Sequence, residues 1–595
     1  MAMQTVPAGG SFLLGESDPQ DLFTPEDFTD EQRLLMSTIR DFVTREVLPQ
    51  TAAIEAKTPG LVPELLKKAG EIGLLSLEIP EVYGGAEMGI VSGMILMESA
   101  ALGGGSFLTS LADHVGIGTL PIVYSGSHAL RQRYLPQLAT GEKLGCYCLT
   151  EAQSGSDALA AQTVAELSPD GTHYLLTGTK QYITNAAFSD LYTVFAKVDK
   201  ALFTAFVVER DAPGLSIGQE EHKMGIIGSS TCPVTLDKVP VPVDNVLGEI
   251  GAGHRVAFNI LNVGRLKLGA GCLGAMKTAM AEAVLYAKQR QQFGRAIASF
   301  GLIQQKIADM AIATYVLESL IYRTAGLIEA QIAMLAPAAA EYDPHVIKAI
   351  EEFAVECSIA KVFGSERLDF VVDEMVQIFG GYGFIEESPA PRAYRDARIN
   401  RIFEGTNEIN RLLIPDTLMR RAMRGQLPLM EAVQQVAGNL LAPVAPLTES
   451  DDHPLQLDQQ MVERCKQAAL LCAGTSVQTF QQELAEQQEI LGLIADMAIE
   501  LYAAESALLR TLKYLDSGDH RSSALRLAMT RSWCRELPEK IERLGAKALA
   551  ASVEGDALAT SLAALKKLTR VTPVNGVTLK RQVAAAIIEA ERYPL

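Results

Sequence analysis

Residues 401–411 read RIFEGTNEINR, and in this stretch one carboxylate, Glu404, directly follows two apolar side chains. Gly405 then permits a left-handed backbone or a close approach of the chain, and Thr406 is a plausible N-cap for a helix behind it. A carboxylate in apolar surroundings has a raised pKa, which a general base working near pH 7 requires. A capping or surface carboxylate at a loop–helix junction is the commoner meaning of a single Glu. Features elsewhere in the chain are therefore needed to decide whether Glu404 is a general base or a capping or surface carboxylate.

Length and composition narrow the classes of protein. A chain of 595 residues is too long for one core, so several domains are expected. The net charge of −19 argues against a nucleic-acid surface and against adhesion to an anionic membrane. The eight cysteines form no CxxC pair and the eight histidines show no ligand spacing, so neither a metal site nor a disulfide framework is predicted. A reducing compartment fits best.

The beginning of the chain carries no recognisable signal or transit peptide, because no basic segment precedes a hydrophobic one. No apolar run approaches ~18 residues without a charge, so no membrane span is expected. Together these features predict a cytoplasmic protein.

The hydrophobic period changes three times along the chain and predicts four domains. Residues 1–145 form an α-helical domain, and residues 146–253 carry short β-rich runs typical of a barrel or sandwich. The helical period returns over 254–435, with a loop at 335–344. A proline- and acid-rich linker at 443–452 then leads into a further helical domain within 436–595, interrupted by a polar break at 517–520.

Four other stretches are candidates for ligand contact. Residues 150–157 form a polar, glycine-bearing loop that could offer N–H and hydroxyl groups to a polar ring or phosphate. Tyr182 and Thr184 stand two residues apart on one predicted strand face, which suits a flat heterocycle but also any half-buried strand. Residues 290–294 and 377–383 are a basic helix end and a glycine-rich turn. The near-fingerprint at 251–256 lies in no βαβ unit, so we interpret it as a turn entering a helix.

Five stretches, taken in order, resemble the acyl-CoA dehydrogenase family of flavoproteins. They are CYCLTEAQSGSD (146–157), KQYITNAAFSD (180–190), RQQFG (290–294), QIFGGYGF (377–384) and RIFEGTNEINR (401–411). The similarity runs from about residue 30 to 425. The helical tail and FGLIQQKIADMAIATYVLESL (300–320) are similar to the very-long-chain branch.

The resemblance implies the acyl-CoA dehydrogenase fold, which is mostly α with a central β-barrel, here with an appended C-terminal helical domain. It implies FAD between barrel and helices, and Glu404 as the catalytic base. Contacts with the flavin are implied for Tyr147, Leu149, Thr150, Tyr182, Thr184, Thr406 and Glu408, and a contact near the CoA and pyrophosphate groups for Ser156. Contacts with the FAD of a neighbouring protomer are implied for Arg290, Phe293, Gln377 and Gly381. The acyl-CoA channel is implied for Phe258, Asn262 and Arg265.

The implied reaction is α,β-dehydrogenation of a fatty acyl-CoA in β-oxidation. Glu404 removes the α-proton, hydride leaves the β-carbon for flavin N5, and trans-2-enoyl-CoA results. The Glu404 N–H and a ribityl hydroxyl hold the thioester oxygen, and an electron-transferring flavoprotein reoxidises the flavin. Two alternatives share the fold: an acyl-CoA oxidase, and an assembly or scaffold protein whose enzymatic role is secondary.

The chain departs from the family pattern at several points. Ala152 replaces a common proline, Tyr182 replaces tryptophan, and Pro415 is expected to interrupt the helix after Arg411. An acidic stretch at 448–452 stands where the very-long-chain enzymes carry a basic membrane-contacting segment, so membrane association is not expected. Asp113 and His114 fall at the implied channel floor and would either shorten it or face away. We expect a long-chain substrate and a homodimer, with the extra helical domain on the face that tetrameric relatives use.

Overall fold

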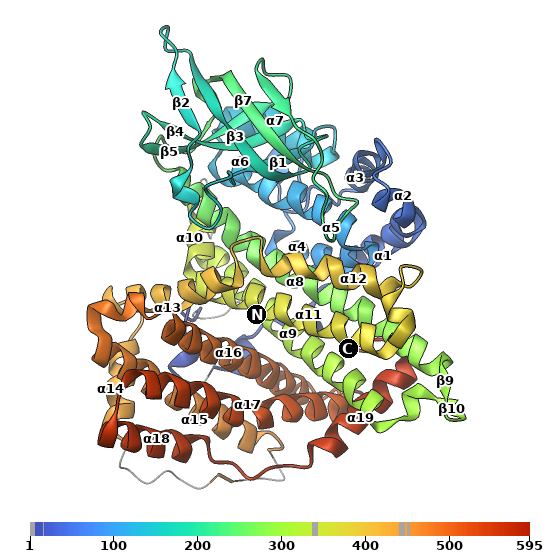
Figure 1. The fold of residues 1–595 in the computed structure, drawn as a ribbon, viewed down its shortest axis with the longest axis vertical. Helices are drawn as coiled ribbons and strands as arrows, with labels where there is room; N and C mark the ends of the chain where they lie inside the picture. Colours follow the sequence, from blue (N-terminus) through green and yellow to red (C-terminus); the bar gives the residue numbers. More distant parts are fainter. Residues whose placement is uncertain (1–5, 16, 336–342, 440–446, 449–452) are drawn as a thin grey trace.

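The computed structural model describes residues 6–15, 17–335, 343–439, 447–448 and 453–595 (Figure 1). Most of the loop expected at 335–344 and of the linker expected at 443–452 lies outside the described residues.

The first part of the chain is helical, and two of its helices begin at capping side chains. Thr29 caps the first long helix: its Oγ1 accepts from the Gln32 N–H and its own N–H donates to Gln32 Oε1, both at 3.1 Å. Ser127 caps the last one through the Leu130 N–H. The helices are α1 (Asp30–Phe42), α2 (Thr51–Glu55), α3 (Leu61–Glu71), α4 (Gly89–Ala100), α5 (Gly105–Ala112), α6 (Leu120–Ser125) and α7 (His128–Thr140), with a π-helical turn η8 (Asp113–Gly118) between α5 and α6.

A β domain with its own hydrophobic core follows (Figure 1, top). Its strands are β1 (Gly145–Cys148), β2 (Val164–Leu167), β3 (His173–Thr184), β4 (Leu191–Val198), β5 (Leu202–Glu209), β6 (Leu215–Ile217), β7 (Thr231–Pro242) and β8 (Val246–Leu247). They pair in the order β6-β7-β3-β2-β4-β5-β8, and β1 lies parallel to β4. The ladder between β3 and β7 shifts register between Lys180 and Ile183, which places a bulge at the end of β3 that faces the helices.

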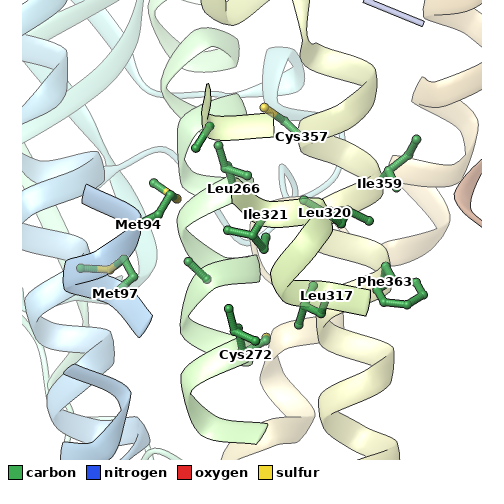
Figure 2. Packing of buried hydrophobic residues seen from close by; sticks show 14 of the residues in the cluster. Met94, Met97, Leu266, Cys272, Leu317, Leu320, Ile321, Cys357, Ile359 and Phe363 are labelled. Atoms are coloured by element: carbon green, nitrogen blue, oxygen red, sulfur yellow. The ribbon is translucent and has the colours of Figure 1, made fainter. Parts of the chain in front are cut away.

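The third part is a bundle around α8 (Gly253–Gln289). Figure 2 shows Leu266 and Cys272 of α8 between Met94 and Met97 of α4 on one side and Leu317 and Phe363 on the other. By length and composition α8 could cross a membrane, but 67% of its most apolar window is buried inside the protein. The other helices are α9 (Gly301–Leu335), α10 (Asp343–Glu352), α11 (Ala354–Phe379), α12 (Pro389–Ala397), α13 (Asn407–Met423) and α14 (Leu429–Gly438), with a small hairpin of β9 (Gln291–Gln292) and β10 (Arg295–Ala296).

Two local expectations in this bundle have different outcomes. The near-fingerprint at 251–256 is the turn that enters α8, as predicted, with Gly251 at φ 83°. The expected interruption at Pro415 is wrong, because α13 runs through Pro415 to Met423. A proline removes one backbone hydrogen bond, and here the buried neighbours Ile414 and Leu418 pack the helix on both sides of it.

Five helices form the C-terminal part, below the bundle in Figure 1: α15 (Gln456–Phe480), α16 (Gln488–Asp516), α17 (Ser523–Ser552), α18 (Gly555–Thr569) and α19 (Gly576–Ala590). Helices α16 and α19 pack on α9. A buried charge cluster joins these parts: Arg510 on α16 pairs with Glu318 of α9 at 2.6 Å and with Glu26 near the N-terminus at 2.7 Å. The Tyr593 hydroxyl donates to the same Glu318 carboxylate. The expected fold class, mostly α with a middle β domain and an appended helical domain, is confirmed.

Candidate active site

Glu404 lies in the short loop between η13 (Arg398–Arg401) and α13. Both Glu404 (φ 59°) and Gly405 (φ 78°) have left-handed backbone conformations, so the chain turns sharply at this point. A non-glycine residue with such a φ is uncommon and costs about 1–3 kcal/mol. Thr406 then caps α13, its Oγ1 accepting from the Ile409 N–H at 3.2 Å, as the sequence predicts.

The Glu404 carboxylate is placed for proton transfer. Its Oε2 is buried and has no hydrogen-bond partner among the described residues. Burial raises its pKa to about 7, against the opposing charges of Arg265 and Lys361. The carboxylate lies against Gly264 of α8, where an added Cβ would come within 2.6 Å of Oε2. The site therefore holds an unsatisfied carboxylate that is half ionised near neutral pH.

Three side chains, those of Arg265, Asn410 and Lys361, hold the loop by its carbonyl groups. Arg265 Nε donates to the Glu404 carbonyl at 3.1 Å, and Asn410 Nδ2 donates to the Gly405 carbonyl at 2.9 Å. Lys361 Nζ donates to the same Gly405 carbonyl at 2.8 Å and to Asn407 Oδ1 at 2.6 Å. The Glu404 N–H, in contrast, donates to no acceptor among the described residues. The loop thus leaves one N–H and one carboxylate oxygen available on the same residue.

This support continues into the C-terminal helices. Asn407 Nδ2 donates to Glu366 Oε1 at 3.0 Å, and Arg411 donates to both oxygens of Glu366. The Arg411 Nε also donates to Asp496 of α16 at 2.8 Å. Sequence reasoning missed Lys361, Glu366 and Asp496. Asn407, Asn410 and Arg411 stand in the 401–411 stretch, but no role was predicted for them.

A cavity of about 1720 Å³ opens in front of Glu404, between the β domain and the helices. It brings together residues from both sides that the sequence had singled out. The β domain supplies Tyr147, Leu149, Thr150, Ser156, Tyr182 and Thr184, and the helices supply Phe258, Asn262, Arg265, Glu404 and Thr406.

The polar and aromatic groups of this cavity fit a dinucleotide such as FAD. Tyr182 lies in the β3 bulge with φ 60° and is 59% exposed, so its flat ring forms part of the cavity wall. The Tyr147 hydroxyl is buried without a partner among the described residues. Strained backbone and orphaned polar atoms of this kind are typical of ligand sites.

A buried ion pair fixes the 150–157 loop beneath these groups. Lys180 Nζ lies 2.7 Å from Glu151 Oε1 and 3.2 Å from the Leu149 carbonyl, and both side chains are almost fully buried. Glu151 also accepts from the N–H groups of Gln162 and Thr163. Burial raises the pKa of Glu151, but Lys180 and these hydrogen bonds outweigh it, so the pKa lies below its ordinary value. Sequence reasoning had not singled out this pair.

Five residues of the implied cofactor set do not line this cavity. Glu408 is exposed at the start of α13. Arg290, Phe293, Gln377 and Gly381 are exposed at the far end of the bundle, around β9, β10 and η12 (Gly380–Phe384). Phe293 is 93% exposed, and the Arg290 guanidinium lies 6.0 Å from the centre of the Tyr382 ring. Within one chain these four form a separate surface group.

A second cavity of about 320 Å³ leads away from Glu404 into the helices, and its wall is mostly apolar. Seven residues line both cavities: Asp113, Ile117, Thr184, Ile226, Ile399, Phe403 and Glu404. Glu404 therefore lies where the two cavities meet.

The two polar residues expected at the channel floor have different positions. Asp113 lines both cavities, and burial, together with Cys148 and Glu404, raises its pKa well above the ordinary value. His114 lines neither cavity, so of the two alternatives predicted for this pair His114 follows the second and faces away. Its Nδ1 accepts from the Gly145 N–H at 3.2 Å and its Nε2 lies 3.1 Å from the Leu138 carbonyl, which ties η8 to β1 and α7. Burial lowers its pKa to about 4, so it is neutral.

Comparison with known proteins agrees with this geometry. Four acyl-CoA dehydrogenase domain families match the chain: the N-terminal domain over residues 29–142, the middle domain over 146–239, and two C-terminal domains over 251–419 and 464–567. A probable acyl-CoA dehydrogenase of Bacillus subtilis is 47% identical over 588 residues, 99% of this chain and 98% of that one. The mitochondrial very long-chain specific acyl-CoA dehydrogenase of Bos taurus is 34% identical, over 79% of this chain and 73% of that one.

Among solved structures, an acyl-CoA dehydrogenase from Bacillus anthracis complexed with FAD superposes with a TM-score of 0.97 at 47% identity. That match covers 99% of this chain and all of the other. Four domain families in order, a full-length relative and a cavity suited to the cofactor lead to one assignment. The chain belongs to the acyl-CoA dehydrogenase family and is an FAD-dependent oxidoreductase.

Proposed function

We propose that this enzyme dehydrogenates long-chain fatty acyl-CoA between the α and β carbons, giving trans-2-enoyl-CoA. The observation that carries the proposal is the position of Glu404: its buried, unpartnered Oε2 lies where the large cavity meets the narrow apolar one. A thioester whose CoA occupied the first cavity and whose acyl chain occupied the second would have its α carbon beside this oxygen.

The protein groups divide the work of proton removal. Glu404, with a pKa of about 7, accepts the α-proton. Its own N–H, which has no described acceptor, would donate to the thioester oxygen as negative charge develops there. Arg265, Lys361 and Asn410 keep this loop in its left-handed turn, so that base and donor are held together. Apolar walls exclude the water that would solvate the carboxylate.

FAD, when bound, supplies the acceptor for the hydride that leaves the β carbon. The residues that would hold it are the β-domain group in the cavity wall, Leu149, Thr150, Tyr182 and Thr184. The Glu151–Lys180 pair would keep the 150–157 loop of this wall in place.

The apolar second cavity supports a long acyl chain. Each buried CH₂ contributes about 0.8 kcal/mol, so binding should strengthen steadily with chain length while apolar wall remains. We also infer an electron-transferring flavoprotein as the electron acceptor and a cytoplasmic location. The location is supported by eight cysteines, all buried and none in a disulfide, as suits a reducing compartment.

The experiment is anaerobic titration of the purified flavoprotein with acyl-CoAs of graded length, following bleaching of the flavin absorbance. We expect bleaching, with the highest kcat/KM for chains longer than about ten carbons, because each further CH₂ adds buried apolar surface. A maximum at butyryl-CoA would contradict the chain-length proposal. Stoichiometric peroxide in air would indicate an oxidase instead, and no reduction by any acyl-CoA would leave only the scaffold role.

A further inference from the structure

The second cavity follows one face of α8 from the catalytic carboxylate to the protein surface. Its lining residues on this helix recur every three or four positions, so they lie on one side of it: Gly264, Lys267, Leu268, Gly271, Cys272, Ala275, Thr278, Ala279 and Glu282. Eighteen residues separate the first from the last, which is roughly 27 Å along the helix axis. Gly264 contacts Glu404, whereas the Glu282 side chain is exposed.

Helix α12 forms the opposite wall and runs back toward the catalytic loop. Pro389 and Arg392 line the cavity at the start of this helix, and Asp396 and Ala397 line it further on. Arg392 precedes Glu404 by twelve residues, which run through α12, the 3-10 turn η13 and the catalytic turn, so the two lie on the order of 15–20 Å apart. A fully extended alkyl chain with C–C bonds of about 1.5 Å advances about 1.25 Å per carbon. In an extended acyl chain, the carbon nearest Arg392 would therefore be about 14 carbons beyond the α carbon, from which Glu404 removes the proton.

The charged residues of the wall between these two ends are Asp113 and the ion-paired Lys267 at the catalytic end and Asp396 on α12. Its uncharged polar residues are Thr51, Thr109, Thr184, Thr278 and Asn400, of which Thr51, Thr278 and Asn400 already donate to backbone carbonyl groups. Lys267 is already paired with Glu78, and Asp396 accepts from the Ile226 N–H. The remaining middle section is Leu102, Leu108, Leu268, Cys272, Ala275, Val372 and Met375. Gly271 leaves this section of the cavity open, because a Cβ added at Gly271 would lie only 3.2 Å from the Leu108 side chain.

The far end is different, because it is charged and partly exposed. Arg392 is half-buried. Its charge acts on Asp396, one helical turn further along α12, but its guanidinium makes no hydrogen bond or ion pair within 4 Å with a described residue. Glu282 is the other charged group at this end, and it too is without a described partner. A guanidinium presents a planar pair of donors that matches a carboxylate.

We propose that this cavity is an acyl channel open at both ends, and that the enzyme accepts long-chain acyl-CoAs whose ω carbon carries a carboxylate, held by Arg392 at the far mouth. The inference rests on the proposed function, because it takes the acyl chain to lie in this cavity. It adds a substrate class, the ω-carboxylated acyl-CoAs, and assigns Arg392 as the residue that recognises it.

The channel predicts that the effect of an ω-carboxylate depends on chain length. A short chain would leave the carboxylate in the apolar middle section, where an unpaired charge costs several kcal/mol, so binding should fall at least ~100-fold relative to the plain chain. A chain of about sixteen carbons would carry the carboxylate to Arg392. The ω-carboxylated and plain chains should then bind within about tenfold of each other.

The test compares two matched pairs: octanoyl-CoA with its ω-carboxy counterpart, and hexadecanoyl-CoA with its ω-carboxy counterpart. Dissociation constants are measured by calorimetry on the FAD-loaded Glu404→Gln variant, which cannot turn over, and kcat/KM on the wild type. If the ω-carboxylate weakened binding equally at both chain lengths, the proposal of an open channel would be overturned. The proposed function would still stand if hexadecanoyl-CoA were oxidised. Failure of hexadecanoyl-CoA itself, with oxidation confined to short chains, would overturn both.

Three variants locate the far mouth. Arg392→Leu should weaken the long ω-carboxy ligand about tenfold relative to hexadecanoyl-CoA, the size of one charged hydrogen bond. Glu282→Gln removes the charge of the other charged lining residue on the surface side of the cavity and should strengthen binding of that ω-carboxy ligand instead. Ala275→Phe should block the channel roughly 16 Å from Gly264, eleven residues along α8, and so abolish binding of both long ligands while octanoyl-CoA still binds. An unchanged ω-carboxy affinity in Arg392→Leu would remove Arg392 from the proposal.

Discussion

At the scale of single residues, Glu404 combines a left-handed backbone with a buried, unpartnered carboxylate oxygen. We expect Glu404→Gln to keep FAD and acyl-CoA binding and to lose flavin reduction by at least ~10²–10⁴-fold, because the amide has the same shape but cannot accept the proton. Stopped-flow measurement of flavin bleaching checks this. The Glu404→Gln/Asp113→Asn double variant tests whether the nearby carboxylate of Asp113 replaces Glu404 as the base. If the double variant still reduced the flavin substantially, the base would have been misassigned.

The pKa of Glu404 also predicts how the rate depends on pH. The base must be ionised, and its pKa is raised from the ordinary 4.5 to about 7. The rate of flavin reduction, measured at limiting acyl-CoA so that the free enzyme is reported, should therefore rise with pH and level off above about 8. A profile that is flat from pH 5 to 9 would exclude Glu404 as the titrating base.

The same shift has an effect on stability that can be measured without substrate. The folded state binds a proton more tightly at Glu404 than the unfolded state does, so its contribution to stability is present below pH 4.5 and is lost as the pH rises through 7. Glu404→Gln should therefore stabilise the FAD-free protein at pH 8 by up to about 3 kcal/mol and much less at pH 5. Melting temperatures of the wild type and of Glu404→Gln, measured without FAD from pH 5 to pH 8, check the sign of this stability difference. A difference that shrinks as the pH rises would contradict it.

At the scale of elements, the Glu151–Lys180 pair holds the cofactor-side loop against β3. Lys180→Met would leave a buried, uncompensated carboxylate, at a cost of about 3–5 kcal/mol. We expect a lower melting temperature and weaker FAD retention. Adding Glu151→Gln should recover part of the loss, because the stranded charge is gone.

Lys566→Met on the exposed face of α18 is the matched control for Lys180→Met. It should change stability by less than about 0.5 kcal/mol, since no described residue pairs with Lys566. If both lysine variants behaved alike, the buried pair would have no special part in holding the loop.

Whether a feature could be predicted from the sequence depends on how far apart in the chain its interacting residues lie. The Thr29 and Thr406 caps and the turn at Gly251 are determined within a few residues, and the structure has each of them. Glu404 was predicted from its own stretch of sequence, whereas most of the other cavity residues were implied only by the family resemblance. Lys361 and Asp496 contact the catalytic segment from 44 and 85 residues away. No local pattern marks such partners, and the same is true of the His114 hydrogen bonds that turn its ring away from the channel.

At the scale of the whole molecule, Arg290, Phe293, Gln377 and Gly381 form an exposed group far from the Glu404 cavity. We predict that they meet the FAD of a second copy, so that the enzyme is a homodimer and the C-terminal helices prevent a tetramer. Sedimentation of the wild type should give a dimer. Phe293→Asp should give monomers that lose FAD, because a charge would enter an apolar contact.

The control for Phe293→Asp is Leu34→Asp, at another exposed apolar side chain, on α1 (66% exposed). It should leave both the dimer and the FAD content unchanged. A stable tetramer of the wild type, or a Phe293→Asp protein that stays dimeric with full FAD, would contradict the prediction.

The charge cluster around Arg510 sets an order of events during synthesis. Glu26 emerges from the ribosome early, but its partner Arg510 follows 484 residues later, a delay of about 25–100 s at 5–20 residues per second. Glu318 pairs with Lys277 of the neighbouring helix α8, but it also needs Arg510 and Tyr593, which are made much later. The central bundle therefore completes its buried charge pairs only once the C-terminal helices have been synthesised.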